Sequence, residues 1–146
     1  MWEETREVIL TDEKLLRVEC IDVLQEEVSE LVLLLEKELE YSAKLGSPGV
    51  GLAAPQIGIN KKISIVRFDQ YKIDLINCEI VNQFDEIVFE NEGCLSFPGK
   101  LYTTKRPQEI HVKSSLCSFI ARGYLAAVIS HELDHLNGIL ITDRKI

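Results

Sequence analysis

The sequence predicts an α+β domain in which mainly antiparallel sheets pack around a central helix, with a long helix near the N-terminus. Two observations predict it. Apolar residues recur at helical spacing in residues 22–44 and 123–136, and short segments rich in Ile, Val and Phe lie between them. The order of helix, strands and helix differs from the regular alternation of a parallel α/β fold. A chain of 146 residues can form one domain with its own core, and we treat it as such.

The first half of the chain opens with a turn or helix cap at Thr11-Asp12-Glu13 and continues in the long helix over residues 22–44. Glu residues separate its apolar positions, as in an amphipathic helix. These positions are Val23, Leu24, Val28, Leu31, Val32, Leu35 and Leu39. Gly46-Ser47-Pro48-Gly49 ends the helix.

The middle of the chain contains short segments with the composition of strands, separated by polar residues. We predict strands at residues 62–68, 73–81, 86–90, 109–113 and 117–121. Residues 93–99 form a loop that ends in Pro98-Gly99. The second helix covers residues 123–136 and stops at Asn137-Gly138.

Negative charge is concentrated in the N-terminal part of the chain. Asp and Glu outnumber Lys and Arg by 24 to 16, which gives a formal charge of −8. Residues 1–44 hold 13 acids and 5 bases, whereas residues 45–146 hold 11 of each. An acidic chain repels phosphate, so we expect no nucleic-acid binding of its own. The acidic stretch is interpreted as the solvated face of the long helix, and an acidic docking face is the alternative.

The sequence carries no sign of a membrane span or an export signal. The apolar run at residues 31–35 is far too short to cross a membrane, and the N-terminus is acidic from Glu3 onward. We therefore expect a cytoplasmic protein without membrane contact. Most cysteines in that reducing compartment are small buried hydrophobic residues. The four in this chain form no CxxC pair: Cys20, Cys78, Cys94 and Cys117.

Residues 131–135, HELDH, form an HExxH motif on the second predicted helix. The spacing puts the imidazoles of His131 and His135 on one helix face, where they can bind a single metal ion. Glu132 follows the first ligand and can reach a water molecule on that ion. A chain of this composition contains the motif by chance with a probability of roughly 0.7%. A half-buried helix with two histidines on one face also needs a partner for them, so the motif predicts a metal site.

Two histidines do not complete a catalytic metal site, which usually has three protein ligands and one open position. Downstream of the motif, residues 142–146 offer only Asp143. We therefore expect the third ligand upstream, where the candidates are His111, the four cysteines and many acidic residues.

Two further segments narrow this choice. Residues 49–56, GVGLAAPQ, are rich in small residues that let another backbone approach closely. Residues 92–96, EGCLS, place Cys94 in a Gly-containing loop between strands. Together with HELDH, in this order and spacing, they resemble the three signature motifs of the peptide deformylases. The resemblance covers nearly the whole chain and implies a single deformylase-like catalytic domain over residues 1–146.

This resemblance implies a divalent metal bound by Cys94, His131 and His135, with water in the fourth position. A thiolate and two imidazoles suit borderline-soft first-row metals. The family usually works best with Fe²⁺, and Zn²⁺, Ni²⁺ or Co²⁺ can replace it. The implied reaction removes the formyl group from N-terminal formyl-methionine. Metal-bound hydroxide attacks the formyl carbon, and Glu132 acts as general base and then as acid towards the leaving amine.

The resemblance also implies roles for residues around the metal. The side-chain amide of Gln56 and the backbone N–H of Leu95 stabilise the tetrahedral oxyanion. Glu92 and Arg106 stand where the family carries an acid and a base, and we expect this pair to hold the Cys94 loop. The alternative for the pair is an ordinary surface ion pair, which contributes little stability.

The implied substrates are formyl-methionyl peptides of nascent chains, and a transient association with the ribosome is a further expectation. The substrate backbone pairs like an added strand with Val50, Gly51 and Gly93. The methionine side chain enters an apolar pocket beside the metal. Candidates for its lining are Tyr124, Ala127 and Val128, which are equally expected to pack the core.

The sequence departs from the family pattern in a few places. Ser130 stands where a Gln often precedes HExxH, and Leu101-Tyr102 stands where many bacterial members carry an Arg. The hairpin around Ser114-Ser115 is shorter than usual, and the chain stops before the C-terminal helix of typical bacterial members. Because short members include virus-encoded ones, a viral source is one expectation. No departure touches a metal ligand, Glu132 or an oxyanion donor, so we expect activity.

Two other functions stay open at this point. A small zinc endopeptidase that uses HExxH would cleave internal peptide bonds and would not depend on Cys94. A non-catalytic binding module with the same fold is the other alternative. The intact Glu132 argues against that module, because binding alone needs no general base.

Overall fold

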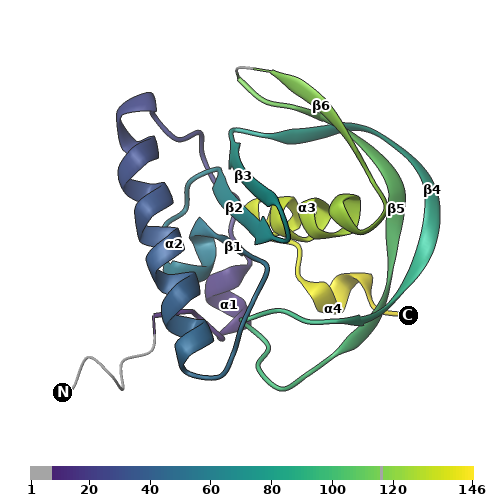
Figure 1. Cartoon of the computed structure of the whole chain (residues 1–146), viewed down its shortest axis with the longest axis horizontal. Coiled ribbons are helices and arrows are strands. Elements are labelled where there is room, and N and C mark those ends of the chain that lie inside the picture. The colour runs from purple at the N-terminus through teal and green to yellow at the C-terminus, as the bar shows by residue number, and fades with distance from the viewer. Residues whose placement is uncertain (1–7, 116) are drawn as a thin grey trace.

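The computed structural model describes residues 8–115 and 117–146, and two antiparallel sheets with a helix between them form its centre (Figure 1). The first sheet has the order β1 (Gly51–Ala53), β2 (Ile63–Phe68), β3 (Tyr71–Ile76). The second has the order β4 (Glu79–Glu92), β5 (Tyr102–Lys113), β6 (Ser118–Arg122). The helix α3 (Gly123–Leu136) contacts both sheets, and α2 (Val28–Lys44) covers the outer side of the first. The predicted α+β class, with antiparallel sheets around the HExxH helix, is confirmed.

Four short helical segments complete the fold: α1 (Glu13–Leu16), the 3₁₀ turns η2 (Gln25–Glu27) and η3 (Ala54–Ile57), and α4 (Ile141–Arg144). The predicted cap before α1 is present, because the side chain of Asp12 accepts the N–H of Lys14 at 2.9 Å. η3 follows β1 directly and carries the end of the GVGLAAPQ segment. The Gly-Ala run is therefore a short strand and a 3₁₀ turn.

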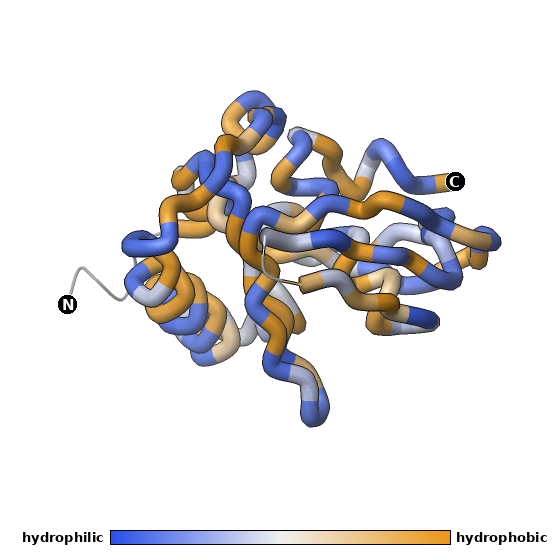
Figure 2. The backbone as a smooth tube through the Cα atoms, turned by 90° about the horizontal axis from the view of Figure 1, so that it is seen from above, coloured by the Kyte–Doolittle hydropathy of each residue, from blue (hydrophilic) through white to orange (hydrophobic). Residues whose placement is uncertain are grey.

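The long N-terminal helix begins at Val28 and not at residue 22. The backbone before it is held elsewhere, because the N–H of Val23 donates to Oδ1 of Asn77 at 2.8 Å and the amide of Asn77 donates to the Val23 carbonyl. Val23 is still buried, as its apolar character required. Hydrophilic and hydrophobic stretches alternate along α2, which is the amphipathic pattern predicted for it (Figure 2).

The strand boundaries differ most from the sequence prediction. Residues 73–81, predicted as one strand, belong to β3 and β4, and the chain turns between them at Asn77 with φ 50°. The predicted strands at 86–90 and 109–113 are parts of the much longer β4 and β5, which pair over most of their length. The turn at Asn77 was missed because apolar residues continue on both sides of it. The full lengths of β4 and β5 were missed because charged residues interrupt the apolar pattern in both strands.

The core has two clusters, one on each face of the first sheet. Leu35 and Leu39 of α2 pack on Ile63 and Ile65, whereas Val66 joins the cluster around α3. A strand buried on both faces reads as a continuous apolar run, which is why β2 was predicted correctly. This packing fixes β1 and α3 next to each other at the site described below.

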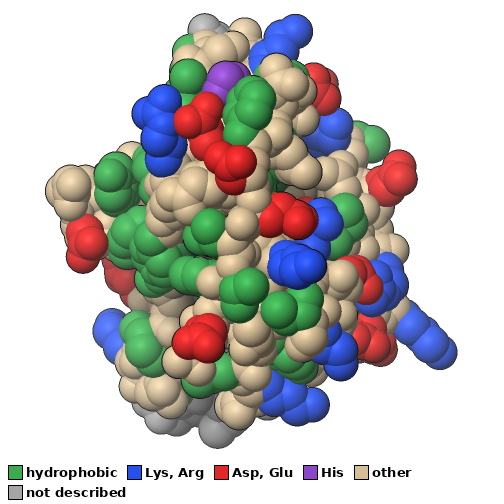
Figure 3. All heavy atoms as spheres, turned by 90° about the vertical axis from the view of Figure 1, so that its right-hand side faces the viewer, with side chains coloured by type: hydrophobic (Ala, Val, Ile, Leu, Met, Phe, Trp, Pro, Cys, Tyr) green, Lys and Arg blue, Asp and Glu red, His purple; other side chains and the backbone are tan. Residues whose placement is uncertain are grey.

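The side of the molecule that holds the second sheet shows apolar and charged side chains interspersed (Figure 3). The exposed apolar residues of β4 and β6 are Val81, Phe84, Val88 and Ile120. In the described part of the chain, no helix has the length and apolarity that crossing a membrane requires.

Candidate metal centre

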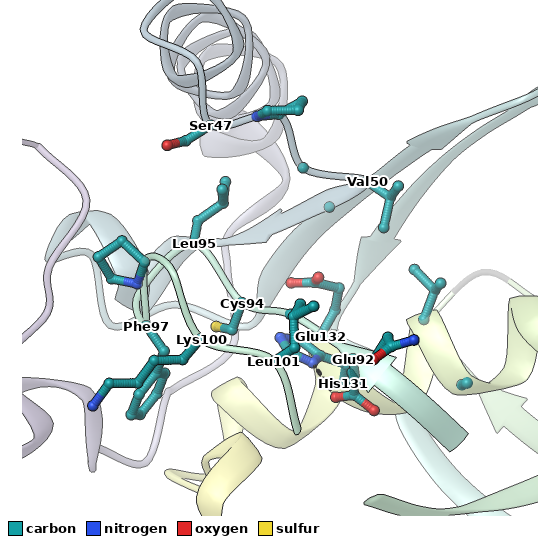
Figure 4. Close-up of a pocket in the computed structure, with 18 of the residues that line it drawn as sticks. Ser47, Val50, Glu92, Cys94, Leu95, Phe97, Lys100, Leu101, His131 and Glu132 are labelled. Atoms are coloured by element: carbon teal, nitrogen blue, oxygen red, sulfur yellow. Dashed lines mark hydrogen bonds and ion pairs between the residues drawn. The ribbon is translucent and has the colours of Figure 1, made fainter. Parts of the chain in front are cut away.

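A cavity of about 530 Å³ opens between β1, α3 and the loop that joins β4 to β5. In Figure 4, side chains from that loop and from α3 face a common space, among them Cys94, Glu132 and His131. The predicted site residues that line the cavity are Val50, Gly51, Gln56, Gly93, Cys94, Leu95, His131 and Glu132. The remaining predicted ligand, His135, lies one helical turn after His131 and is almost fully buried.

The three predicted metal ligands meet at one point. One ligand atom each from Cys94, His131 and His135 lie within 4.8 Å of one another, and no other such group occurs among the described residues. The Sγ of Cys94 is 3.5 Å from Nε2 of His135. A thiol and two imidazoles that converge in this way fit a tetrahedral ion of the first transition row. The residues present therefore fit a divalent metal with an open fourth position.

The other candidates for the third ligand lie elsewhere. His111 is on β5, where its Nε2 is 2.8 Å from Oε2 of Glu109. Cys20 and Cys78 are buried in the core, and burial raises the pKa of each thiol to about 11. Cys117 is exposed, unlike most cysteines of this kind.

Glu92 orients His131 through the ring nitrogen that does not face the other ligands. Nδ1 of His131 donates to Oε2 of Glu92 at 2.7 Å, which leaves Nε2 of the ring for the ligand cluster. Glu92 also accepts the hydroxyl of Thr104 at 2.7 Å and two N–H groups of Arg106, at 3.0 and 2.6 Å. Burial alone would raise the pKa of Glu92, but its hydrogen bonds with His131 and Arg106 lower it to about 2. The Glu92–Arg106 pair is therefore a buried pair, unlike the surface pair that was the alternative.

The two histidines have opposite electrostatic surroundings. Burial disfavours the charged form of His131, but its contacts with Cys94 and Glu92 outweigh this and raise its pKa well above the usual range. Burial, followed by the neighbouring charge of His131, lowers the pKa of His135 well below the usual range. These surroundings favour a neutral His135, and a metal ion that bound here would take the place of any proton on Nε2 of His131.

Glu132 lies between the ligands and β1. Its side chain is buried, and within the described ranges its Oε1 has no hydrogen-bond partner. Burial raises the pKa of its carboxyl to about 7, although the charges of His131 and Arg106 act in the opposite direction. A carboxyl with a pKa near neutrality is suited to general acid–base catalysis. A Cβ on Gly51 would be 2.6 Å from Oε2 of Glu132, so only glycine lets β1 lie this close to the carboxylate.

Gln56 presents its amide to the same space. Its Oε1 accepts the N–H of Ala53 at 3.0 Å, which orients the side chain. Its Nε2 donates to the hydroxyl of Ser96 at 3.0 Å and lies 3.7 Å from Sγ of Cys94. The N–H of Leu95 has no acceptor within the part of the chain that the structure describes. Both groups are therefore donors next to the predicted ligands.

The apolar part of the cavity contains the three predicted pocket residues, Tyr124, Ala127 and Val128. Ala127 and Val128 are buried, while Tyr124 is 48% exposed and packs edge-on against Phe68. Of the departures from the family pattern, Ser130 is buried and its hydroxyl has no partner among the described residues. Leu101 lines the cavity and is 66% exposed.

Sequence reasoning missed four side chains of the site. Ser96 and Thr104 are the hydroxyl partners of Gln56 and Glu92. The carboxylate of Asp134 accepts hydrogen bonds from Arg106 and Arg144. Ser96 lies in the EGCLS segment and Asp134 in HELDH, so their place in these motifs could have indicated a role at the site. Thr104 and Arg144 lie outside any motif.

Comparisons with known proteins agree with this geometry. The family model described as Polypeptide deformylase matches residues 5–146. A peptide deformylase of Dictyoglomus turgidum is 41% identical over 126 residues, which are 83% of this chain and 81% of that protein. The crystal structure of the Thermotoga maritima peptide deformylase superposes with a TM-score of 0.83 at 33% identity, covering 96% of this chain and 97% of that one.

A third comparison is with a peptide deformylase that carries a bound peptide. It is the Met-Ala-Ser-bound class I type b enzyme of Acinetobacter baumannii, with a TM-score of 0.78 and 28% identity over 94% of this chain and 96% of that one. The family match over nearly the whole sequence, the relatives and the convergence of one Cys and two His ligands agree. The chain therefore belongs to the peptide deformylase family of metal-dependent hydrolases.

Proposed function

We propose that this chain removes the formyl group from formyl-methionyl peptides with a divalent metal held by Cys94, His131 and His135. The observation that carries the proposal is the convergence of these three ligands beside the buried carboxylate of Glu132. Fe²⁺ is the proposed native ion, and Zn²⁺, Ni²⁺ and Co²⁺ are proposed substitutes, because thiolate and imidazole ligands suit this group of metals. Residues 1–146 are proposed to act as one catalytic domain.

The chemistry divides between the ion and Glu132. A bound divalent ion polarises the formyl carbonyl and lowers the pKa of a water molecule towards about 7. Glu132 takes a proton from the attacking water and returns it to the nitrogen of the leaving amine. Its unpartnered Oε1 and its raised pKa, about 7, support this role. Beside a divalent cation the Glu132 carboxyl would be held in its charged form, which is the form that accepts a proton.

The oxyanion that forms on the formyl oxygen needs donors that are already in place. We assign this role to Nε2 of Gln56 and to the backbone N–H of Leu95. Gln56 is 2% exposed and its orientation is fixed by Ala53 and Ser96, so little reorganisation accompanies the reaction. Losing one such donor typically costs about 3–4 kcal/mol of transition-state stabilisation.

The peptide is proposed to bind along β1. Among the described residues this strand pairs with β2 on one side only. Its other edge is then open for an added strand at Val50 and Gly51, with Gly93 opposite. The methionine side chain would then enter the apolar part of the cavity at Ala127 and Val128. The Acinetobacter relative is bound to Met-Ala-Ser, a peptide that begins with methionine.

Nascent polypeptides are the proposed source of substrate, and the cytoplasm is the proposed location. A transient association with the ribosome would supply formylated N-termini at high local concentration. Because the N-terminal part of the chain is acidic, this association would involve protein and not RNA phosphate.

Formate release tests the proposed reaction. Protein purified without oxygen and loaded with Fe²⁺ or Ni²⁺ is expected to release formate from formyl-Met-Ala-Ser, and metal content is measured on the same sample. Unformylated casein is the matched substrate for the endopeptidase alternative, and we expect it to stay intact. Casein cleavage at a rate that rivals formate release, or no formate with any of the metals, would contradict the proposal.

A further inference from the structure

Arg144, in the last helical segment of the chain, reaches the metal centre through other side chains. α4 lies beside β5 and follows closely after α3 (Figure 1). Nε of Arg144 donates to Oδ2 of Asp134 at 3.0 Å, and its Nη2 donates to Oδ1 at 2.9 Å. This paired geometry fixes a carboxylate in orientation as well as in charge. Asp134 is 8% exposed, so Arg144 connects the surface with a buried group.

The contacts continue from Asp134 to a metal ligand. Oδ2 of Asp134 also accepts Nη1 of Arg106 at 2.7 Å. The other two nitrogens of Arg106 donate to both oxygens of Glu92, and Oε2 of Glu92 accepts Nδ1 of His131 at 2.7 Å. The sequence of contacts therefore runs Arg144, Asp134, Arg106, Glu92, His131, and every bond in it is charge-assisted.

Arg144 gives the two buried carboxylates of this network a second guanidinium partner. Asp134 and Glu92 contribute two buried carboxylates, and Arg106, which is 2% exposed, contributes one guanidinium. Arg144 supplies the second guanidinium, and both of its hydrogen bonds go to Asp134. Without it, Arg106 is the single guanidinium shared by two carboxylates, and a buried charge that loses its partner destabilises its surroundings strongly.

The backbone after Arg144 also supports the carboxylate of Glu92, through its contacts with β5. Lys145 forms an antiparallel bridge with Thr104, and the N–H of Ile146 donates to the carbonyl of Thr103 at 2.9 Å. The hydroxyl of Thr104 donates to Oε1 of Glu92. The terminal segment thus fixes the part of β5 that holds Glu92.

We propose that Arg144 is a positioning residue of the metal centre. By holding Asp134 it keeps Arg106 on Glu92, and Glu92 then keeps the proton of His131 on Nδ1 and directs Nε2 to the metal. Groups behind a metal-binding histidine typically change metal affinity or activity by about 10–100-fold. The inference rests on the proposed metal site of Cys94, His131 and His135.

The test compares Arg144→Gln with Arg17→Gln. Arg17 binds the same segment at Asp143, with Nη1 to Oδ2 at 2.8 Å and Nη2 to Oδ1 at 3.0 Å, but it does not contact the network. Both variants remove one cation that fastens α4, and only the first removes a partner of Asp134. Co²⁺ affinity, the visible absorption spectrum of the Co²⁺-loaded protein and Tm are measured for each.

Arg144→Gln is expected to weaken Co²⁺ binding about tenfold and to change the Co²⁺ spectrum. Arg17→Gln is expected to lower Tm while Co²⁺ affinity and spectrum stay those of the wild type. Arg144→Lys, which keeps the charge but offers a single donor group, should restore part of the affinity. In an Asp134→Asn background, Arg144→Gln should have no further effect on affinity.

Three results would overturn the inference. The first is a Co²⁺ affinity of Arg144→Gln within twofold of the wild type, with an unchanged spectrum. The second is an equal loss of affinity in Arg17→Gln, which would indicate a general loosening of α4. The third is a wild-type protein that binds no Co²⁺, and this result alone would also overturn the proposed metal site.

Discussion

At the scale of single residues, Gln56 has separable structural and chemical contacts. Its Oε1 accepts the N–H of Ala53, and its Nε2 is the proposed oxyanion donor. Gln56→Glu keeps an acceptor for Ala53 but removes the donor and sets a negative charge against the oxyanion. We expect kcat to fall by at least about 100-fold with metal content unchanged. A variant with the kcat of the wild type would remove Gln56 from the mechanism.

Gly51 and Gly49 provide a matched pair in the substrate-binding segment. A Cβ at Gly51 meets Oε2 of Glu132 at 2.6 Å and the carbonyl of Ile65 at 2.9 Å, whereas the three atoms nearest to one at Gly49 all belong to the flexible side chain of Leu95. We expect Gly51→Ala to lose about 1–3 kcal/mol of unfolding free energy and most of its activity. Gly49→Ala should change both much less. Chemical denaturation and formate release are measured for both variants. Equal losses in Gly51→Ala and Gly49→Ala would contradict the described packing.

Ser130, a departure from the family pattern, places an unpaired hydroxyl in the core of the described structure. Its buried hydroxyl has no partner among the described residues. Removing such a group recovers its desolvation penalty, so Ser130→Ala should leave stability unchanged or raise it by about 1 kcal/mol. Urea denaturation of the metal-free protein tests this. A clear loss of stability would show that the hydroxyl is bonded after all.

At the scale of elements, α3 was predicted with its observed bounds because both ends carry local signals. Asn137-Gly138 follows the last turn, and the apolar pattern begins directly after Gly123. β5 was predicted only at its C-terminal part. Its earlier residues include Arg106 and Pro107, which do not read as a strand. Arg106 is buried because Glu92 and Asp134 pair with it, and a pairing between distant segments leaves no mark on local periodicity.

The pairing of β4 with β5 makes stability depend on acidity through Glu92. Its carboxyl has a pKa of about 2 in the folded protein, below the usual 4.5. The native state therefore gains stability from the charged form above pH 4.5, and this gain is lost as the pH falls towards about 2. Metal-free Glu92→Gln should show a shallower decrease of stability across this range. Glu90→Gln, an exposed neighbour on β4, should keep the wild-type slope.

At the scale of the whole molecule, the sequence motifs identified the ligands, but not how the protein supports them. Cys94 and the HExxH helix come together because α3 lies between the two sheets and lines the same cavity as the β4–β5 loop. The contacts of Asp134 with Arg106 and Arg144 depend on that packing, so no spacing rule could predict them. The acidic residues concentrate in residues 1–44, ahead of every segment that builds the site.

The central claim is that Glu132 moves protons in a metal centre built by the rest of the site. Glu132→Gln removes the base and keeps the side-chain volume. With metal content equal to that of the wild type, we expect formate release from formyl-Met-Ala-Ser to fall by about 10²–10⁴-fold. A metal-loaded Glu132→Gln protein that releases formate at the wild-type rate would contradict this account.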